Sequence, residues 1–333
     1  MAIRVVVIGA GSWGTTVAHL AAHNAPTTLW ARDETVAKEI DAEHRNGRYL
    51  PGYTLHESLR ATSAFDECVA AADVLVMGVP SHGFRSTLEA VSQHLRPWVP
   101  VVSLTKGLEQ GTKLRMSQVV HEVLPGHPVA VLTGPNLAKE ILSGQAAAAV
   151  VAMADEFISS ELQSIFATDL FRVYVNRDVI GSELGGVLKN VIAIAAGMAD
   201  GTGAGDNTRA AVMTRGLAEM TRLGVALGGD QQTFAGLAGM GDLLATCMSP
   251  QSRNRYVGEQ LGKGRGIDDI IAEMNQVAEG VKSCRTVLEL AEEHGVDMPI
   301  ASEVVGVVHG GRRAIDAYRG LLARKATHEH NPG

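Results

Sequence analysis

The sequence predicts an α/β fold, in which a doubly wound, mostly parallel sheet comes first and an all-α region follows. Through the first half of the chain, short β-branched runs alternate with amphipathic helical stretches, the pattern of a parallel sheet covered by helices. After about Val179 these runs stop and consecutive helical patterns take over. Because 333 residues are many for one hydrophobic core, we expect two domains, residues 1–180 and 181–333.

Each element is expected from its local residue pattern. Strands are expected at the apolar runs Ile3–Ile8, Thr27–Trp30, Val74–Gly78, Val101–Ser103, Val129–Leu132, Ala147–Val151 and Phe171–Val175. Helices are expected between them, including Thr15–Ala22, Val36–Arg45, Thr87–Leu95 and one that starts at Pro135. The helices expected in the second half are Leu184–Met198, Thr208–Leu227, Phe234–Gly239, Gly241–Met248, Tyr256–Gly262, Ile267–Met274, Cys284–His294 and Pro299–Val308.

Charge and cysteine content exclude several classes of function. The formal net charge of −7 argues against general binding to nucleic acid or to an anionic membrane surface. Cys68, Cys247 and Cys284 are widely spaced and form no CxxC or Cys/His cluster, so neither a disulfide framework nor a metal site is expected. No apolar run approaches the ~18 residues of a membrane-spanning helix. We therefore expect a cytoplasmic protein with buried free thiols.

A glycine-rich turn near the start of the chain predicts a dinucleotide site. Gly9, Gly11 and Gly14 form a G-x-G-x-x-G pattern directly after a predicted strand and at the opening of a helix. The first glycine permits a tight turn, the second lets the backbone approach a pyrophosphate, and the third lets helix and strand pack closely. The anion would bind at the positive end of the helix. This pattern is typical of the Rossmann fold; a glycine-rich turn without a ligand is the alternative.

The end of the second predicted strand carries Arg32 followed by Asp33. An acidic residue near this point would hold the ribose 2′-OH of NAD, whereas an arginine would accommodate the 2′-phosphate of NADP. Since Arg32 comes first, we expect NADP to be accepted. A solvated charge pair that caps the next helix remains an open alternative.

Polar residues follow three further strands at the carboxyl edge of the predicted sheet, where ligands of such folds bind. Ser81 follows the first of these strands, Lys106 the second, and Gly134 and Asn136 the third. We expect Lys106 to bind an anion or a carbonyl oxygen, against the alternative of a surface lysine in a loop. For residues 134–136 a plain turn at a helix start is the alternative, and His82 is interpreted as a helix-start residue.

One lysine, Lys189, stands in a helical stretch that is apolar nearly all round. A buried lysine is rare unless it is paired or used. Burial lowers a lysine pKa toward neutrality, as acid–base catalysis near pH 7 requires. Its neighbours three and four positions away are Gly185, Gly186, Ile192 and Ala193, and the small ones would leave room for a ligand. We therefore predict a catalytic rather than a structural lysine.

Two more polar motifs lie downstream. Asp242 and Thr246 share a helix face at i, i+4, where Asp242 could pair with a lysine or orient a substrate hydroxyl. Arg253 stands between Ser252 and Asn254, a candidate phosphate clamp because the guanidinium fork binds phosphate in a bidentate manner. A solvated polar loop is the alternative for this second motif.

Taken together, these motifs resemble the NAD(P)-dependent sn-glycerol-3-phosphate dehydrogenases of bacterial type, over nearly the whole chain. The resemblance implies a Rossmann domain plus an all-helical domain, with NADPH or NADH as cofactor. It implies reduction of dihydroxyacetone phosphate to sn-glycerol 3-phosphate, the entry step to glycerophospholipids. The matching segments are 9–14, 79–81, 105–107, 134–136, 188–193, 214–219, 239–246, 251–254 and 277–280.

The resemblance also implies roles for individual residues. The implied catalytic residues are Lys189, which exchanges the proton, Lys106, Asp242 and Asn190. The implied substrate site comprises Lys106, Gly134, Asn136, Lys189, Asp242, Thr246, Ser252, Arg253 and Asn254. The implied cofactor site comprises Gly9, Gly11, Ser12, Trp13, Gly14, Arg32, Tyr49, Ser81, Lys106, Ala138, Arg253, Val277 and Glu279. Asn136 departs from the hydroxyl residue common in bacterial members, although its amide can still hydrogen-bond.

Two other functions stay open on the sequence alone. One is a related reductase of the ketopantoate or β-hydroxyacid type, which needs a carboxylate clamp, whereas the motif around Arg253 suits phosphate better. The other is a non-catalytic NAD-sensing protein, against which Lys189 argues. As partners we expect a small phosphorylated substrate and a second copy of the chain, with a homodimer through the helical domain, and neither nucleic acid nor membrane insertion.

Overall fold

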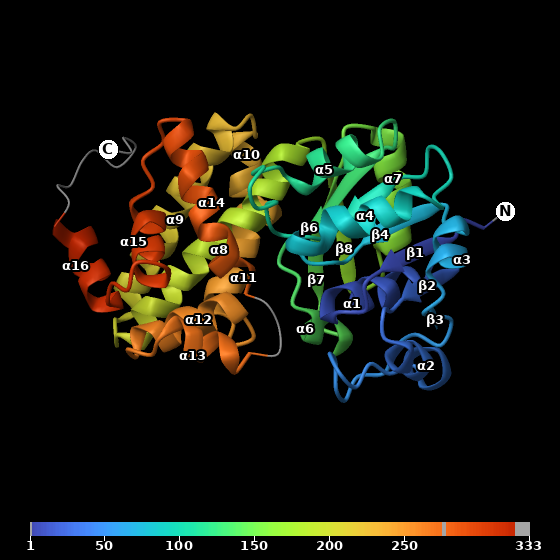
Figure 1. The fold of residues 1–333 in the computed structure, drawn as a ribbon, viewed down its shortest axis with the longest axis horizontal. Coiled ribbons are helices and arrows are strands. Elements are labelled where there is room, and N and C mark those ends of the chain that lie inside the picture. Colours follow the sequence, from blue (N-terminus) through green and yellow to red (C-terminus); the bar gives the residue numbers. More distant parts are fainter. Residues whose placement is uncertain (1, 275–277, 324–333) are drawn as a thin grey trace. The chain divides into compact units, whose positions relative to one another are not determined.

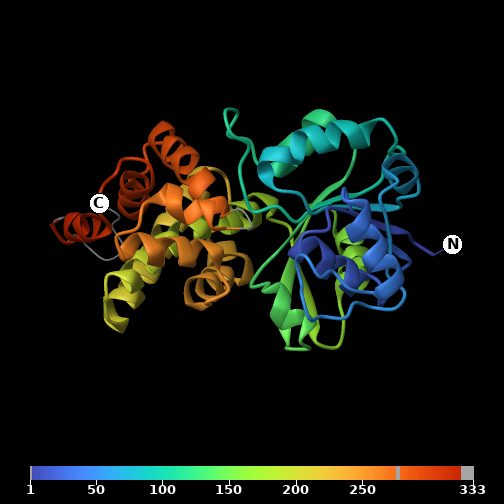
Figure 2. The same ribbon diagram turned by 60° about the horizontal axis from the view of Figure 1, so that its bottom comes forward.

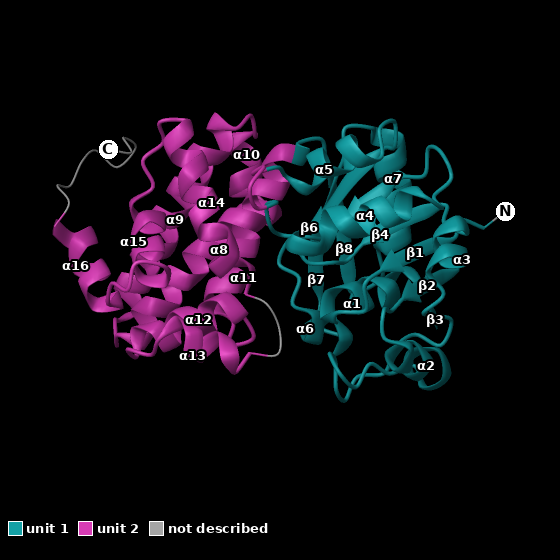
Figure 3. Cartoon of the chain, viewed as in Figure 1, with its two compact units in different colours: residues 1–109, 114–179 teal, residues 110–113, 180–333 magenta. Residues whose placement is uncertain are grey.

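The computed structural model describes residues 2–274 and 278–323, which form two compact units (Figure 3). Unit 1 comprises residues 1–109 and 114–179, and unit 2 comprises residues 110–113 and 180–333. The chain therefore passes from one unit to the other three times, because the short segment 110–113 groups with unit 2.

Unit 1 is built on one eight-stranded sheet with the strand order β3-β2-β1-β4-β5-β6-β7-β8 (Figure 1). Every neighbouring pair is parallel except β6 and β7, which are antiparallel. The doubly wound, mostly parallel sheet that the sequence predicted is confirmed. The strands are β1 Val5–Ile8, β2 Thr27–Trp30, β3 Arg60–Thr62, β4 Val74–Met77, β5 Val101–Ser103, β6 Val129–Thr133, β7 Ala147–Ala152 and β8 Phe171–Asn176.

Helices cover both faces of this sheet, with α4 and α5 on one side and α1 and α7 on the other (Figure 2). Successive residues of a strand point to opposite faces, so Val5 and Val7 enter one hydrophobic core and Val6 and Ile8 the other. The helical elements are α1 Ser12–Ala21, α2 Glu34–Glu43, α3 Phe65–Ala70, the 3₁₀ helix η1 Ser81–Gly83, α4 Phe84–Ser92, α5 Met116–Val123, α6 Ala138–Leu142 and α7 Glu156–Phe166.

Among the described residues of unit 2, every secondary-structure element is a helix. Its elements are α8 Val179–Gly201, α9 Asp206–Ala226, α10 Gln231–Ala235, the π-helix η2 Leu237–Gly241, α11 Asp242–Met248, α12 Arg253–Gly262, α13 Ile267–Ala272, α14 Glu279–Glu293, α15 Pro299–Val308 and α16 Ala314–Ala323. By length and composition α8 could cross a membrane, which corrects the expectation that no stretch approaches such a span. It is a core helix, since 89% of its apolar window is buried inside the protein.

Several expected helices begin or end at other residues in the structure, and two of them differ in a way that the backbone explains. The helix expected from Pro135 begins at Ala138, because the residue before it, Leu137, has an extended backbone with φ −84° and ψ 106°. The helix expected over residues 234–239 is two elements, α10 and η2, because Gly236 adopts φ −92° and ψ −162° and interrupts it. The sequence prediction also missed β3 and α16.

The packing of α8 against α12 depends on glycines. A Cβ on Gly197 would lie 2.0 Å from the carbonyl oxygen of Arg255, and a Cβ on Gly258 would lie 2.0 Å from that of Ile194. The two helix backbones therefore approach more closely than any larger residue would allow. This contact brings the start of α12, which carries predicted site residues, to the middle of α8.

Candidate active site

The turn between β1 and α1 has the shape of a pyrophosphate cradle. Gly9 adopts φ +113°, and a Cβ there would lie 2.7 Å from the carbonyl oxygen of Gly78. A Cβ on Gly14 would lie 2.1 Å from the carbonyl oxygen of Gly9, so helix and strand need this glycine to pack. At Gly11, by contrast, no described atom lies within 4 Å of the Cβ position, and no side chain caps α1. The open N-terminus of α1 fits a dinucleotide phosphate.

A buried asparagine that the sequence analysis missed organises the same turn. Nδ2 of Asn46 donates to the carbonyl oxygen of Ala10 at 3.0 Å and to Oγ1 of Thr15 at 2.9 Å. Ser12 donates through Oγ to the carbonyl oxygen of Tyr49 at 3.1 Å, so two predicted cofactor residues are in contact. Nε1 of Trp13 is buried without a hydrogen-bond partner among the described residues.

The ribose end of the predicted site lies where β2 ends. Asp33 accepts from the N–H of Thr35 at 2.9 Å and thereby caps α2, the structural role that the sequence left open. Its second carboxylate oxygen pairs with Nη1 of Arg48 at 3.1 Å. Arg32, next to it, is exposed.

A second cluster in unit 1 joins the carboxyl ends of β5 and β6. Nζ of Lys106 donates to the carbonyl oxygen of Gly134 at 2.9 Å. The amide oxygen and nitrogen of Asn136 are sealed from solvent and have no hydrogen-bond partner among the residues that the structure describes. A buried amide without partners is costly, so this arrangement fits a polar ligand. Ser81 is buried at the start of η1, at the end of the neighbouring β4.

In unit 2, Lys189 is the centre of a buried polar cluster. It lies on α8 with 6% of its surface exposed, and Asp242 on α11 has 2% exposed. Nζ of Lys189 donates to Oδ1 of Asp242 at 2.8 Å and to Oγ1 of Thr246 at 2.5 Å. The space beside Gly185 is not open to a ligand as expected, since a Cβ there would lie 2.3 Å from the carbonyl oxygen of Ala238 in η2.

Asn190, the next residue along α8, takes part in a second series of hydrogen bonds. Oδ1 of Asn190 accepts from Nδ2 of Asn254 at 2.9 Å, and Oδ1 of Asn254 accepts from the N–H of Gly280 at 2.9 Å. Beside it, Oγ of Ser252 accepts from the N–H of Arg255 and caps α12. The structure thus joins three helices at the candidate phosphate clamp.

Arg253 is the first residue of α12 and lies next in sequence to Ser252 and Asn254. Desolvation by the surrounding protein lowers the pKa of its guanidinium, and the charge of Glu279 at the start of α14 opposes that effect. The guanidinium stays a cation, as a phosphate ligand must be.

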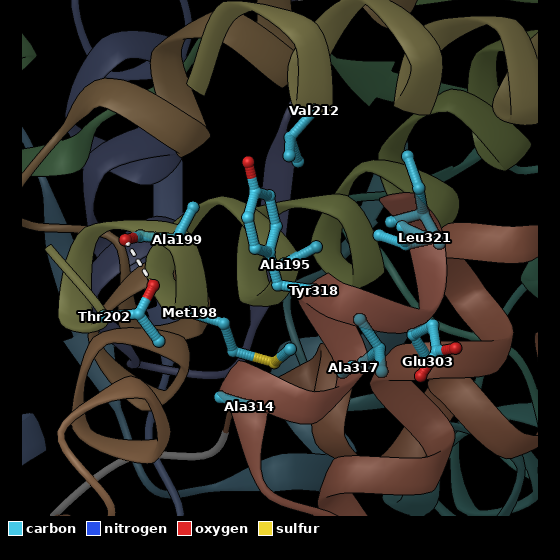
Figure 4. A pocket seen from close by; sticks show the side chains of 12 residues that line it. Ala195, Met198, Ala199, Thr202, Val212, Glu303, Ala314, Ala317, Tyr318 and Leu321 are labelled. Carbon is cyan, nitrogen blue, oxygen red and sulfur yellow. Dashed lines mark hydrogen bonds between the residues drawn. The ribbon is translucent and has the colours of Figure 1, made fainter. Parts of the chain in front are cut away.

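A separate small cavity in unit 2 lies between α8, α9, α15 and α16 (Figure 4). Its lining is mostly apolar and includes none of the predicted site residues. Thr202, one of its few polar side chains, donates to the backbone of Ala199. This cavity is therefore not the candidate active site.

Comparison with known proteins identifies the family. Residues 4–158 match the family model described as NAD-dependent glycerol-3-phosphate dehydrogenase N-terminus, and residues 178–319 match the model for its C-terminus. The chain belongs to the NAD-dependent glycerol-3-phosphate dehydrogenase family.

Individual members of this family are similar over their full lengths. The NAD(P)+ glycerol-3-phosphate dehydrogenase 2 of Sphingopyxis alaskensis is 62% identical over 100% of both chains. The NAD(P)+ enzyme of Mycobacterium avium is 57% identical over 99% of this chain and 97% of its own. The crystal structure of glycerol-3-phosphate dehydrogenase from Coxiella burnetii superposes with a TM-score of 0.92 at 36% identity, covering 97% of this chain and 99% of that one.

Two predicted cofactor residues of this dehydrogenase, Ala138 and Val277, remain to be located. Ala138 is the first residue of α6, and Val277 lies outside the described residues.

The three cysteines are free and buried. Burial raises the pKa of Cys68 and Cys247 to about 12 and that of Cys284 to about 11. Within residues 2–274 and 278–323, no group of three or more His, Cys, Asp or Glu could hold a metal ion.

Proposed function

We propose that the chain reduces dihydroxyacetone phosphate to sn-glycerol 3-phosphate with NADPH or NADH, in a reversible reaction that feeds glycerophospholipid synthesis. The observation that carries this proposal is the buried cluster of Lys189, Asp242 and Thr246 in a chain of the glycerol-3-phosphate dehydrogenase family. The ketopantoate-type alternative is not favoured, because the full-length relatives at 57–62% identity are glycerol-3-phosphate dehydrogenases.

Lys189 is the general acid of the reduction and the general base of the reverse reaction. Asp242 and Thr246 both accept from its Nζ, so the nitrogen that carries the proton is fixed in position from α11. When bound, the nicotinamide supplies the hydride for the substrate carbonyl carbon. Lys189 gives the proton to the carbonyl oxygen, where negative charge develops.

Further residues bind the substrate and position it in this proposal. Lys106 stabilises the charge on the reacting oxygen and also contacts the cofactor. The amide of Asn136, which has no hydrogen-bond partner among the described residues, gains partners from the substrate. Arg253, with Ser252 and Asn254, binds the phosphate. This remote binding energy holds the carbonyl in the reactive orientation.

The two units divide the work in this proposal. Unit 1 binds the dinucleotide along the open N-terminus of α1, and unit 2 supplies the acid–base lysine and the phosphate clamp.

We also infer a cytoplasmic homodimer with its interface in the helical unit. Sedimentation at twice the 35.1 kDa of one chain would support the dimer, and sedimentation as a single chain would exclude it.

A pair of substitutions tests the assignment of roles. Lys189→Ala is expected to lower kcat by about 10²–10⁴-fold, the usual contribution of a general acid, while NADPH binding stays near normal. Arg253→Ala is expected mainly to raise KM for dihydroxyacetone phosphate. Lys263→Ala, which removes an exposed lysine of α12's C-terminus, is the control for the loss of one charge. A near-normal kcat in Lys189→Ala would remove the lysine from the mechanism.

A further inference from the structure

Asp33, at the end of β2, already has two partners in unit 1. Its Oδ1 accepts from the N–H of Thr35 at 2.9 Å and caps α2. Its Oδ2 pairs with Nη1 of Arg48 at 3.1 Å. In folds of this kind a carboxylate at this point binds the ribose 2′-OH of NAD. In this protein the guanidinium of Arg48 forms an ion pair with that carboxylate.

The loop that carries Arg48 is anchored to the pyrophosphate turn. Asn46 holds the carbonyl oxygen of Ala10, and the carbonyl oxygen of Tyr49 accepts from Ser12. The guanidinium of Arg48 lies 5.4 Å from the centre of the Tyr49 ring, within cation–π range. One loop therefore fixes the cradle for the pyrophosphate and places a second arginine at the ribose end.

Two guanidinium groups near the end of β2 can contact an anionic ligand, while the nearby carboxylate of Glu39 accepts from the N–H of Gly47 at 3.0 Å. Arg32 and Arg48 are both exposed, while Glu34 is paired with Lys38 at 2.7 Å and adds little net charge. Exposed ion pairs such as the one between Asp33 and Arg48 are weak. Arg48 can therefore exchange the carboxylate for a phosphate at small cost, and hydrogen bonds from guanidinium to phosphate are among the strong ones.

We propose that Arg48 acts with Arg32 to bind the 2′-phosphate of NADPH, and that the Asp33–Arg48 pair sets the choice of cofactor. With NADPH, Arg48 binds the phosphate while Asp33 continues to cap α2. With NADH, the carboxylate is the group available to the ribose. This inference rests on the proposed function only in taking NADPH or NADH as the cofactor.

Calorimetric titration of the full chain with adenosine 2′,5′-bisphosphate and with 5′-AMP tests the proposal without turnover. Arg48→Ala is expected to weaken bisphosphate binding by about tenfold or more and to change 5′-AMP binding by less than about twofold. Asp33→Asn keeps a good helix cap but removes the competing charge, so it is expected to strengthen bisphosphate binding. Arg45→Ala, an exposed arginine of the same loop, is the matched control and should change neither affinity.

The outcomes separate this proposal from the function on which it rests. Equal weakening of both probes by Arg48→Ala would mean that the residue only supports the loop, and the proposal would fall. Unchanged bisphosphate affinity with normal 5′-AMP binding would also overturn it, while the dehydrogenase assignment would stand. If the unsubstituted chain bound neither probe, the nucleotide site itself and the role of Arg48 would both be lost.

Discussion

Among single residues, Glu219 of α9 combines deep burial with an ionisable group. Its two carboxylate oxygens accept from the N–H groups of Ile300 and Ala301 at 2.8 and 3.2 Å, and so cap the start of α15. Burial raises the pKa of Glu219 to about 7, while these two hydrogen bonds and Arg222 oppose the shift. The folded protein therefore binds this proton more tightly than the unfolded chain does.

The sign of the resulting pH dependence follows from that difference. The stability contributed by protonated Glu219 is complete below pH 4.5, the value of an unperturbed glutamate, and is lost as pH rises through about 7. Between pH 5 and 8 we expect the free energy of unfolding to fall by about 2–3 kcal/mol relative to Glu219→Gln, which cannot ionise.

Urea unfolding of both proteins at pH 5 and pH 8 measures this difference. Glu292→Gln, which removes an exposed carboxyl group of α14, is the control and should follow the unsubstituted chain. A gap between Glu219→Gln and the unsubstituted chain that does not change with pH would contradict the assignment.

How far single site residues could be predicted depends on where their partners lie in the chain. The burial of Lys189 was predictable because apolar residues surround it along one helix, although its partners Asp242 and Thr246 lie 53 and 57 residues away in the chain. The roles of Glu219 and Asn46 were not predictable, because Glu219 caps a helix 81 residues away and Asn46 bonds to a turn 36 residues earlier. Likewise, helical periodicity could not reveal that the space beside Gly185 is filled by the backbone of Ala238.

At the scale of elements, a substitution at Gly258 tests whether the close approach of α8 and α12 requires a glycine. Gly258→Ala places a Cβ 2.0 Å from the carbonyl oxygen of Ile194, so α12 must move away from α8. We expect a loss of about 1–3 kcal/mol in the free energy of unfolding, the usual cost of overpacking. Because Asn254 of α12 bonds Asn190 of α8, KM for dihydroxyacetone phosphate should rise as well.

A second glycine within a helix provides the control for this test. At Gly306 of α15 a Cβ would meet its nearest atom, the Cδ of Arg312, at an ordinary 3.7 Å. Gly306→Ala makes the same change in helix propensity without the clash, and should stabilise the protein by about 0.5–1 kcal/mol. Urea unfolding compares the two, and equal behaviour of both variants would rule out backbone contact as the role of Gly258.

Elements were predictable from sequence where local pattern decides them. The strand positions were predicted to within a residue or two because parallel strands buried on both faces are continuous apolar runs. The short β3, with its polar Arg60 and Thr62, has no such run and was missed. The start of α6 was misplaced because proline at a helix start is only a local preference, and the backbone is still extended at Leu137.

At the scale of the whole molecule, the chain order of elements predicted two regions of different architecture. What periodicity could not predict is that residues 110–113 group with the helical unit, since the ion pairs of Lys113 with Glu289 and Glu293 join segments about 180 residues apart. Each unit nevertheless has its own buried apolar residues, on both faces of the sheet in unit 1 and along α8 in unit 2. Such units can unfold separately, and the chain then violates two-state behaviour.

The positions of the tryptophans make this separation measurable. Trp13, Trp30 and Trp98, the three tryptophans of the chain, all belong to unit 1, whereas far-ultraviolet circular dichroism also follows the helices of unit 2. Gly258→Ala should therefore lower the urea midpoint seen by circular dichroism and leave the midpoint seen by tryptophan fluorescence unchanged. Leu75→Ala, a fully buried change in β4 that costs about 2–5 kcal/mol, should instead lower the fluorescence midpoint. If both signals shifted together in both variants, the two units would unfold as one.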